Sequence, residues 1–137
     1  MPTNAAEVNT LTADQKAAGW KLLFDGKSLT GWRGFKKKEA PKQGWVIEEG
    51  ILKKQKGVSG GDIITDQTFG DFDLEWDWLI SPGGNNGIKY FITEERTSAI
   101  GHEYQMLDDA VHPDGKLGAK RTTASFYDVL PPSDKKP

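Results

Sequence analysis

One stretch constrains the fold more than any other: residues 71–93, which read DFDLEWDWLISPGGNNGIKYFIT. In residues 71–80, apolar side chains occupy every second position and acidic side chains fill most of the positions between them. A period of two places the two sets on opposite faces of a β-strand. A Pro-Gly-Gly-Asn-Asn turn follows, and residues 87–93 alternate again. The stretch therefore predicts an antiparallel hairpin of residues 71–80 with residues 87–93.

The rest of the chain predicts further short strands and a single helix. Thr12-Ala-Asp-Gln15 has the spacing of a capping box, so we expect a short surface helix at residues 13–18. Alternating residues and turn signals predict strands at residues 20–24, 45–48, 51–53, 62–65, 101–109 and 123–130. Roughly seven or eight short strands with one helix are typical of an all-β sandwich or jelly roll.

The length of 137 residues suits one domain, and no change in composition suggests two. We expect an N-terminal tail and short helix at residues 1–18, followed by a jelly-roll domain at residues 19–137. Two prolines stop the last strand, and no closing strand follows in residues 133–137. The sandwich is therefore expected to be incomplete at its C-terminal end, with some sheet edges unpaired.

Composition excludes several classes of partner. The net charge of −2 and the pI of about 5.7 argue against nucleic acid, which is normally met by a basic surface. No stretch is apolar enough to span a bilayer, so no membrane partner is expected. Residues 1–19 contain no apolar core of a signal peptide, and the chain has no cysteine. Oligomeric state is left open by the sequence.

The best candidates for chemistry are Glu103, Gln105 and Asp108, spaced as E-x-Q-x-x-D in a predicted strand. Glu103 and Gln105 share a face by alternation, whereas Asp108 joins them only if a β-bulge near Met106 or Leu107 inserts one extra residue. Two carboxylates and an amide on one face could supply an acid, a base and an orienting group. The alternative is that these are ordinary carboxylates on the solvent face of a strand.

Other polar and aromatic residues have two readings each. At the hairpin tip and just after it, Asn85, Asn86 and Lys89 could hydrogen-bond a sugar or a carboxylate, although Asn and Gly also simply form turns. Trp76 and Trp78 share a strand face with apolar residues, which favours core packing over sugar stacking. Tyr127 and its neighbour Asp128 lie on opposite faces of the last predicted strand, so only one of them can point to the side of Glu103.

Motifs for organic cofactors are absent, and no zinc or EF-hand spacing occurs. No organic cofactor is therefore expected. A divalent cation is left open, because carboxylates can hold a hard cation at Glu103, Asp108, Asp109 and Asp114.

The order and spacing of several motifs resemble the 3-keto-disaccharide hydrolase domain family. The resemblance begins with GWKLLFDGKSLTGW at residues 19–32 and covers nearly the whole chain past residue 18. The other matching segments are residues 45–52, 61–65, 72–78, 84–88, 101–109 and 127–130. The resemblance implies a concanavalin A-like jelly roll with a carbohydrate cleft on its concave face. It also implies bacterial, often exported proteins that act on glycosides oxidised to a ketone at C3, and further strands beyond residue 137.

By this resemblance Glu103 is the catalytic base or acid, Asp108 is its partner and Gln105 orients the substrate. The residues implied as sugar contacts are Asn86, Lys89, Tyr90 and Tyr127. Three positions depart from the family: Asn86 where Ser is more frequent, Phe91 where Arg is common, and Ala124 where Gly is expected.

Three functions compete at this point. The first is hydrolysis of 3-keto glycosides, in which a carboxylate removes the proton on C2 that the ketone acidifies. The second is an ordinary glycosidase that uses two carboxylates. The third is a non-catalytic carbohydrate-binding module, and fold likeness alone does not separate the three.

Overall fold

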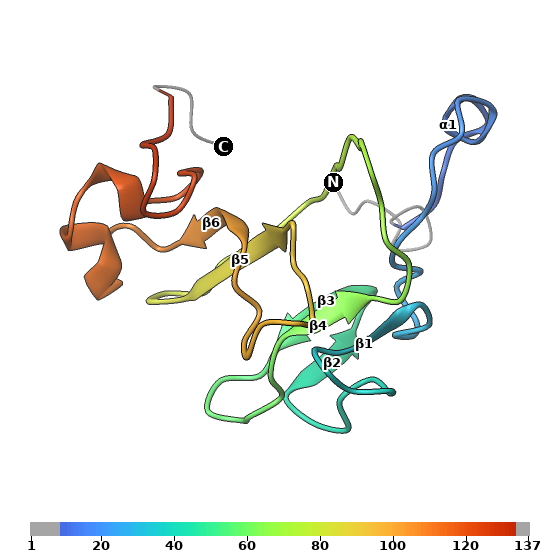
Figure 1. Ribbon diagram of the computed structural model, residues 1–137, viewed down its shortest axis with the longest axis horizontal. Coiled ribbons are helices and arrows are strands. Elements are labelled where there is room, and N and C mark those ends of the chain that lie inside the picture. The colour runs from blue at the N-terminus through green and yellow to red at the C-terminus, as the bar shows by residue number, and fades with distance from the viewer. Residues whose placement is uncertain (1–8, 134–137) are drawn as a thin grey trace. The chain divides into compact units, whose positions relative to one another are not determined.

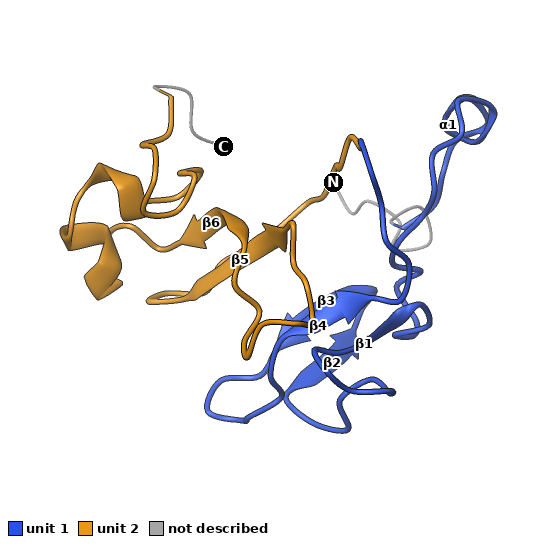
Figure 2. Cartoon of the chain, viewed as in Figure 1, with its two compact units in different colours: residues 1–71 blue, residues 72–137 orange. Residues whose placement is uncertain are grey.

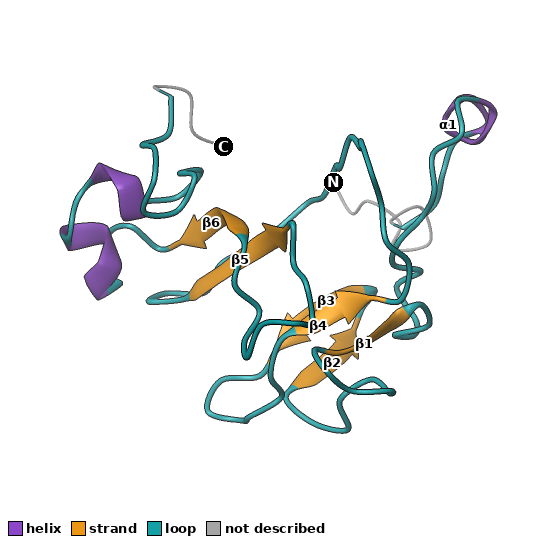
Figure 3. Ribbon diagram, in the orientation of Figure 1, coloured by secondary structure: helices purple, strands orange, loops and turns teal. Residues whose placement is uncertain are grey.

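A computed structural model (Figure 1) describes residues 9–133, and the chain divides into two compact units, residues 1–71 and 72–137 (Figure 2). Each described strand pairs with one other, giving three two-stranded sheets in which every pairing is antiparallel. The strands are β1 (Trp32–Gly34), β2 (Trp45–Glu48), β3 (Ile51–Lys54), β4 (Ile63–Thr65), β5 (Asn85–Tyr90) and β6 (His102–Leu107). Loops connect them and helix is scarce (Figure 3), so the predicted all-β class is confirmed.

The helices are short and lie outside the sheets. The α-helix α1 (Ala13–Ala17) starts at the predicted capping box, in which Gln15 N donates to Thr12 Oγ1 at 3.1 Å and Thr12 N donates to Gln15 Oε1 at 2.9 Å. It buries no residue, as expected of a surface helix. Two 3₁₀ turns, η1 (Pro113–Lys116) and η2 (Ala119–Arg121), follow β6. Within residues 9–133, none of these helices has the length and apolarity to cross a bilayer.

In the first unit, the predicted hairpin at residues 45–53 is confirmed as β2 and β3. Its turn, Glu49-Gly50, has positive φ at both residues, 51° and 77°, as a two-residue hairpin turn requires. The remaining two strands, β1 and β4, pair with each other, with Arg33 opposite Ile64.

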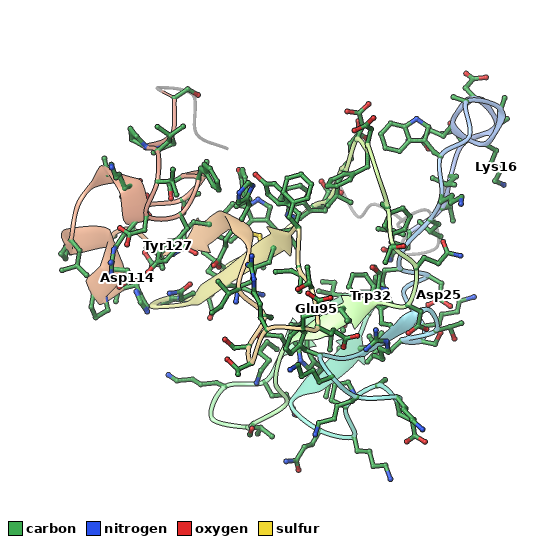
Figure 4. The ribbon with its side chains drawn as sticks, in the orientation of Figure 1. Lys16, Asp25, Trp32, Glu95, Asp114 and Tyr127 are labelled. Carbon is green, nitrogen blue, oxygen red and sulfur yellow. The ribbon has the colours of Figure 1, made fainter. Side chains whose placement is uncertain are left out.

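The predicted strand at residues 20–24 is wrong, because this segment lies in a loop. A residue of β1 holds this loop in place: the indole Nε1 of Trp32 donates a hydrogen bond to Leu23 O at 2.6 Å. The Asp25 carboxylate then accepts the N–H groups of Lys27 and Ser28, each at 2.8 Å, and fixes a turn there. Trp32 and Asp25 are both labelled in Figure 4. The Trp32 side chain, and not pairing with a neighbouring strand, therefore holds this segment.

In the second unit, β5 pairs with β6 and not with residues 71–80. The register is unbroken, from Asn85 opposite Leu107 to Tyr90 opposite His102. The predicted hairpin of residues 71–80 with residues 87–93 is therefore wrong. Periodicity identifies a strand and its two faces, but it carries no information on which segment completes the ladder.

Residues 74–80 nevertheless keep the predicted alternation without forming a strand. Leu74, Trp76, Trp78 and Ile80 are half-buried, and the residues between them are exposed. The Trp76 ring contacts Tyr104 edge-on at a centroid distance of 5.1 Å, and its Nε1 lies 3.4 Å from Met106 Sδ. The period of two thus arises from packing on β6, which supports the core-packing interpretation of Trp76.

The predicted last strand at residues 123–130 is also wrong. Positive φ at Ala124 (63°) and Asp128 (59°) turns the chain, leaving only isolated bridges at Phe126 and Leu130. The segment still lies along the edge of β6 that does not pair with β5, because Ala124 N donates to Gln105 O at 2.9 Å and Tyr127 N donates to Glu103 O at 2.9 Å. Strand β6 therefore has β5 along one edge and this irregular segment along the other.

Candidate active site

The register of β5 and β6 divides their side chains between two faces. One face, called the polar face below, carries Asn85, Gly87, Lys89, Glu103, Gln105 and Leu107. The other, called the aromatic face, carries Asn86, Ile88, Tyr90, His102, Tyr104 and Met106. Trp76 and Phe72 pack on the aromatic face, against Tyr104 and Tyr90 respectively. The polar face therefore remains as the candidate for chemistry.

Glu103 and Lys89 lie directly opposite each other on the polar face. Glu103 is half-buried and Lys89 is exposed. Opposite charges at facing positions of two antiparallel strands attract each other. The Glu103 side chain also leans over Gly87: a Cβ placed on Gly87 would lie 2.7 Å from both Cγ and Cδ of Glu103. The polar face thus presents a carboxylate and an ammonium group at neighbouring positions.

Gln105 shares the polar face with Glu103, as alternation predicted, but it lies beneath the surface with 1% exposure. Its Oε1 has no hydrogen-bond partner among residues 9–133, and neither has the Oγ of fully buried Ser125. An unpaired buried acceptor is unfavourable unless a water or a ligand satisfies it. The role of Gln105 in orienting a substrate stays a prediction. The Oε1 atom of Gln105 is the acceptor that such a hydrogen bond would use.

Asp108 does not reach the polar face through a bulge, because the ladder runs without interruption to Leu107. The bulge on which that placement of Asp108 depended does not occur at Met106 or Leu107. The carboxylate instead links two turns: its Oδ2 accepts the N–H of Gly83, before β5, at 2.8 Å, and its Oδ1 accepts the N–H of Ala110, after β6, at 3.1 Å. These bonds, that of Gly83 first, hold the pKa of Asp108 below its ordinary value of 3.8. An acid that stays ionised suits the fixing of a turn better than proton donation.

Asp108→Asn is expected to lower the thermal unfolding midpoint at neutral pH. A depressed pKa means that the stabilisation is present above the unfolded value of 3.8 and is lost as pH falls through the lower folded value. The difference in unfolding midpoint between variant and wild type should therefore narrow as the pH falls. Thermal melts followed by circular dichroism, from neutral to acidic pH, will measure it. Asp73→Asn, at an exposed carboxylate, is the control. A gap independent of pH would contradict this role.

Asn86 and Tyr90 lie on the aromatic face, so the structure separates these two predicted sugar contacts from Glu103. Asn86 Oδ1 accepts the N–H of Gly87 at 2.9 Å, and the Tyr90 ring packs against that of His102 at 5.3 Å. Lys89 is the predicted contact that does lie beside Glu103. Asn85, the other asparagine of the predicted hairpin tip, also lies on the polar face, opposite Leu107.

Tyr127 and Asp128 converge on one residue, so their predicted placement on opposite strand faces is wrong. Arg121 donates to both Asp128 oxygens, from Nε at 3.1 Å and from Nη2 at 2.9 Å, and its guanidinium lies 5.5 Å from the centre of the Tyr127 ring. The Tyr127 hydroxyl donates to Asp114 Oδ2 at 3.1 Å (both labelled in Figure 4). Burial is the main cause that raises the pKa of Tyr127, and its hydrogen bond to Asp114 raises it further. The hydrogen bond from Arg121 lowers the pKa of Asp128.

Three of the four carboxylates suggested as cation ligands accept hydrogen bonds, two from backbone N–H groups and one from a hydroxyl. Asp108 binds backbone N–H groups, Asp109 Oδ1 accepts Thr123 N–H at 2.7 Å, and Asp114 accepts the Tyr127 hydroxyl. Among residues 9–133, no three His, Cys, Asp or Glu side chains gather as a set of metal ligands. The structure therefore does not bring the suggested ligands together.

Antiparallel pairing throughout, with a carboxylate on the polar face of a sheet, fits an all-β protein of the jelly-roll class. Within that class, the chain belongs to the family described as the 3-keto-alpha-glucoside-1,2-lyase-like domain, which residues 19–137 match. The family resemblance seen in the sequence motifs is thereby confirmed.

Two similar proteins have hydrolase names. A 3-keto-disaccharide hydrolase from Bacteroides thetaiotaomicron is 38% identical, over 97% of this chain and 53% of its own length. A crystal structure from Parabacteroides distasonis, provisionally described as that of a glycosyl hydrolase, superposes with a TM-score of 0.81 at 34% identity and covers 94% of this chain and 62% of its own. The chain thus spans about half the length of the curated relative that it matches.

Proposed function

We propose that the polar face forms part of the active site of a carbohydrate hydrolase that acts on 3-keto glycosides. The observation that carries the proposal is the pair of opposite charges on this face, with Glu103 directly across from Lys89. Membership of the family and the name of the Bacteroides relative support the choice of a keto sugar as substrate.

The chemistry follows from the ketone. A carbonyl at C3 acidifies the hydrogen on C2, and the Glu103 carboxylate removes it, so that the C2–H electron pair forms an enolate with the C3 oxygen. The enolate re-forms the ketone by making a C1–C2 double bond and breaking the bond from C1 to the leaving oxygen, which takes a proton. Water then adds across C1–C2, with its hydroxyl on C1 and a hydrogen on C2. The sum is hydrolysis, with no external oxidant or reductant.

The residues on the polar face suit this sequence. The half-burial of Glu103 removes part of its water shell, and carbon acids are deprotonated faster by a base that does not first have to shed water. The Lys89 ammonium is the cationic group facing it, and positive charge near a developing enolate lowers the barrier. Once protonated, Glu103 can return the proton to the leaving oxygen. In this proposal Asp108 holds the turn at the end of β6.

An ordinary glycosidase needs a second carboxylate across the scissile bond from the first. Asp108 was the candidate, and its two oxygens accept backbone N–H groups, that of Gly83 before β5 and that of Ala110 after β6. This arrangement gives the two-carboxylate function less support than proton abstraction by Glu103 alone.

The test is to incubate the chain with a 3-keto disaccharide and with its unoxidised parent, in D₂O, and to follow products by mass spectrometry. We expect monosaccharide release from the keto sugar only, with one deuterium gained at C2. Release from the parent without deuterium at C2 would indicate an ordinary glycosidase. Saturable binding without release from either sugar would indicate a binding module, and the proposal would then fail for this chain.

A further inference from the structure

Gly87 lies in the middle of β5, and its backbone conformation does not explain why the residue there is glycine. It is not among the glycines with positive φ, so an L-residue could adopt its conformation. Glycine within a strand usually weakens it and marks a place where another group approaches closely. The group here is the Glu103 carboxylate, whose Oε1 would overlap a Cβ on Gly87, with Cγ and Cδ both 2.7 Å away.

Two other glycines of this unit differ in what surrounds them. A Cβ on Gly84 would lie 2.8 Å from the backbone oxygen of Ser81, and one on Gly101 would lie 2.5 Å from that of Tyr90. An isoleucine side chain also approaches each position, Ile80 at Gly84 and Ile92 at Gly101, but the backbone oxygen cannot turn aside as a side chain can, so glycine is needed for the fold. At Gly87 the three nearest atoms all belong to the side chain of Glu103.

We propose that Gly87 is a positioning residue for Glu103: the missing side chain leaves the space in which the carboxylate lies on the polar face. This inference rests on the proposed role of Glu103 as the base. A methyl group at position 87 fills that space, and the contact falls on side-chain atoms of Glu103 from Cγ outward, so Glu103 must change rotamer while the strand stays in place. The base is then displaced from the C2 hydrogen that it must reach.

The first arm of the test is Gly87→Ala assayed on a 3-keto disaccharide. A displacement of the order of an ångström at a reacting group lowers turnover by about 10²-fold, so we expect kcat to fall by that factor with KM little changed. The unfolding midpoint should not fall, because alanine is no worse in a strand than glycine. Gly70→Ala is the matched control, since a Cβ there meets nothing within 4 Å.

A double-mutant cycle separates positioning from a general effect. If Gly87 acts through the Glu103 carboxylate, adding Gly87→Ala to Glu103→Gln should lower the residual rate by less than about twofold, because the base is already lost. An equal loss in both backgrounds, full turnover in Gly87→Ala, or failure of that variant to fold would each overturn the proposal.

The second arm needs no substrate, so its failure is distinct from that of the proposed function. The ¹³Cδ resonance of Glu103 is titrated by NMR in wild type, Gly87→Ala and Gly70→Ala. We expect the resonance and its midpoint to shift in Gly87→Ala alone, because the carboxylate has moved. If the wild type cleaves no keto sugar but this shift is seen, the positioning of Glu103 by Gly87 is supported and the proposed reaction is wrong. Identical titrations in all three proteins would overturn the positioning.

Discussion

Glu103→Gln is expected to lower the turnover of a 3-keto disaccharide by about 10³-fold, the middle of the range for loss of a general base. Glutamine has the shape of glutamate, so the side chain can keep its place over Gly87 and its position opposite Lys89. It cannot accept the C2 proton. The loss should therefore appear in kcat, with KM changed by only a small factor, because binding the sugar does not require the proton to move.

Steady-state kinetics of product release measure this effect, and the rate of deuterium incorporation at C2 measures it at the proton-transfer step. Glu95→Gln, at an exposed carboxylate of the same unit, removes the same charge and should retain wild-type turnover. If Glu103→Gln keeps more than about a tenth of the wild-type rate, Glu103 does not contribute at the level of a general base.

Thr123→Val is expected to destabilise the second unit by about 2–5 kcal/mol, because one buried hydroxyl serves two buried backbone groups. Thr123 is 6% exposed, and its Oγ1 accepts Leu107 N–H at 3.0 Å and donates to Leu107 O at 2.5 Å. Valine fills the same volume without either bond. Leu107 N–H and C=O, at the end of β6, would then be left buried and unpaired.

Urea unfolding followed by tryptophan fluorescence reports this change, since Trp76 packs on β6 beside Met106. Thr122→Val is a matched control one residue away. Its hydroxyl donates to Ala119 O at 3.0 Å in an exposed setting, where water can replace it, so we expect a change within about 0.5 kcal/mol. Equal unfolding free energies for the two variants would show that the Thr123 bonds do not stabilise the strand end.

Elements specified by neighbouring residues were predictable from the sequence. The capping box around Thr12 and the Glu49-Gly50 turn each involve groups within a few residues of one another. The partner of β5 was not predictable, because the choice between residues 71–80 and β6 depends on contacts between distant segments. Residues 71–80 have the pattern of a strand, and the packing of Trp76 against Tyr104 of β6, rather than a ladder, satisfies it.

The candidate site was predictable to the same extent. Alternation placed Glu103 and Gln105 on one face, but Lys89 and Gly87 could be placed beside Glu103 only from the register with β5. The family pattern expects Gly at position 124, and the structure gives the reason: Ala124 has a φ of 63°. That conformation costs an L-residue about 1–2 kcal/mol relative to glycine.

The two faces of the β5–β6 hairpin have a consequence for how such a protein can evolve. Side chains that pack with Trp76 and Phe72 point one way, and those around Glu103 point the other. Substitutions at sites without shared contacts combine with nearly additive effects. Selection can therefore alter the aromatic face to adjust thermal tolerance, and the polar face to change the chemistry that we propose for it, with little epistasis between the two. The single backbone ladder that joins the faces is inherited unchanged in either case.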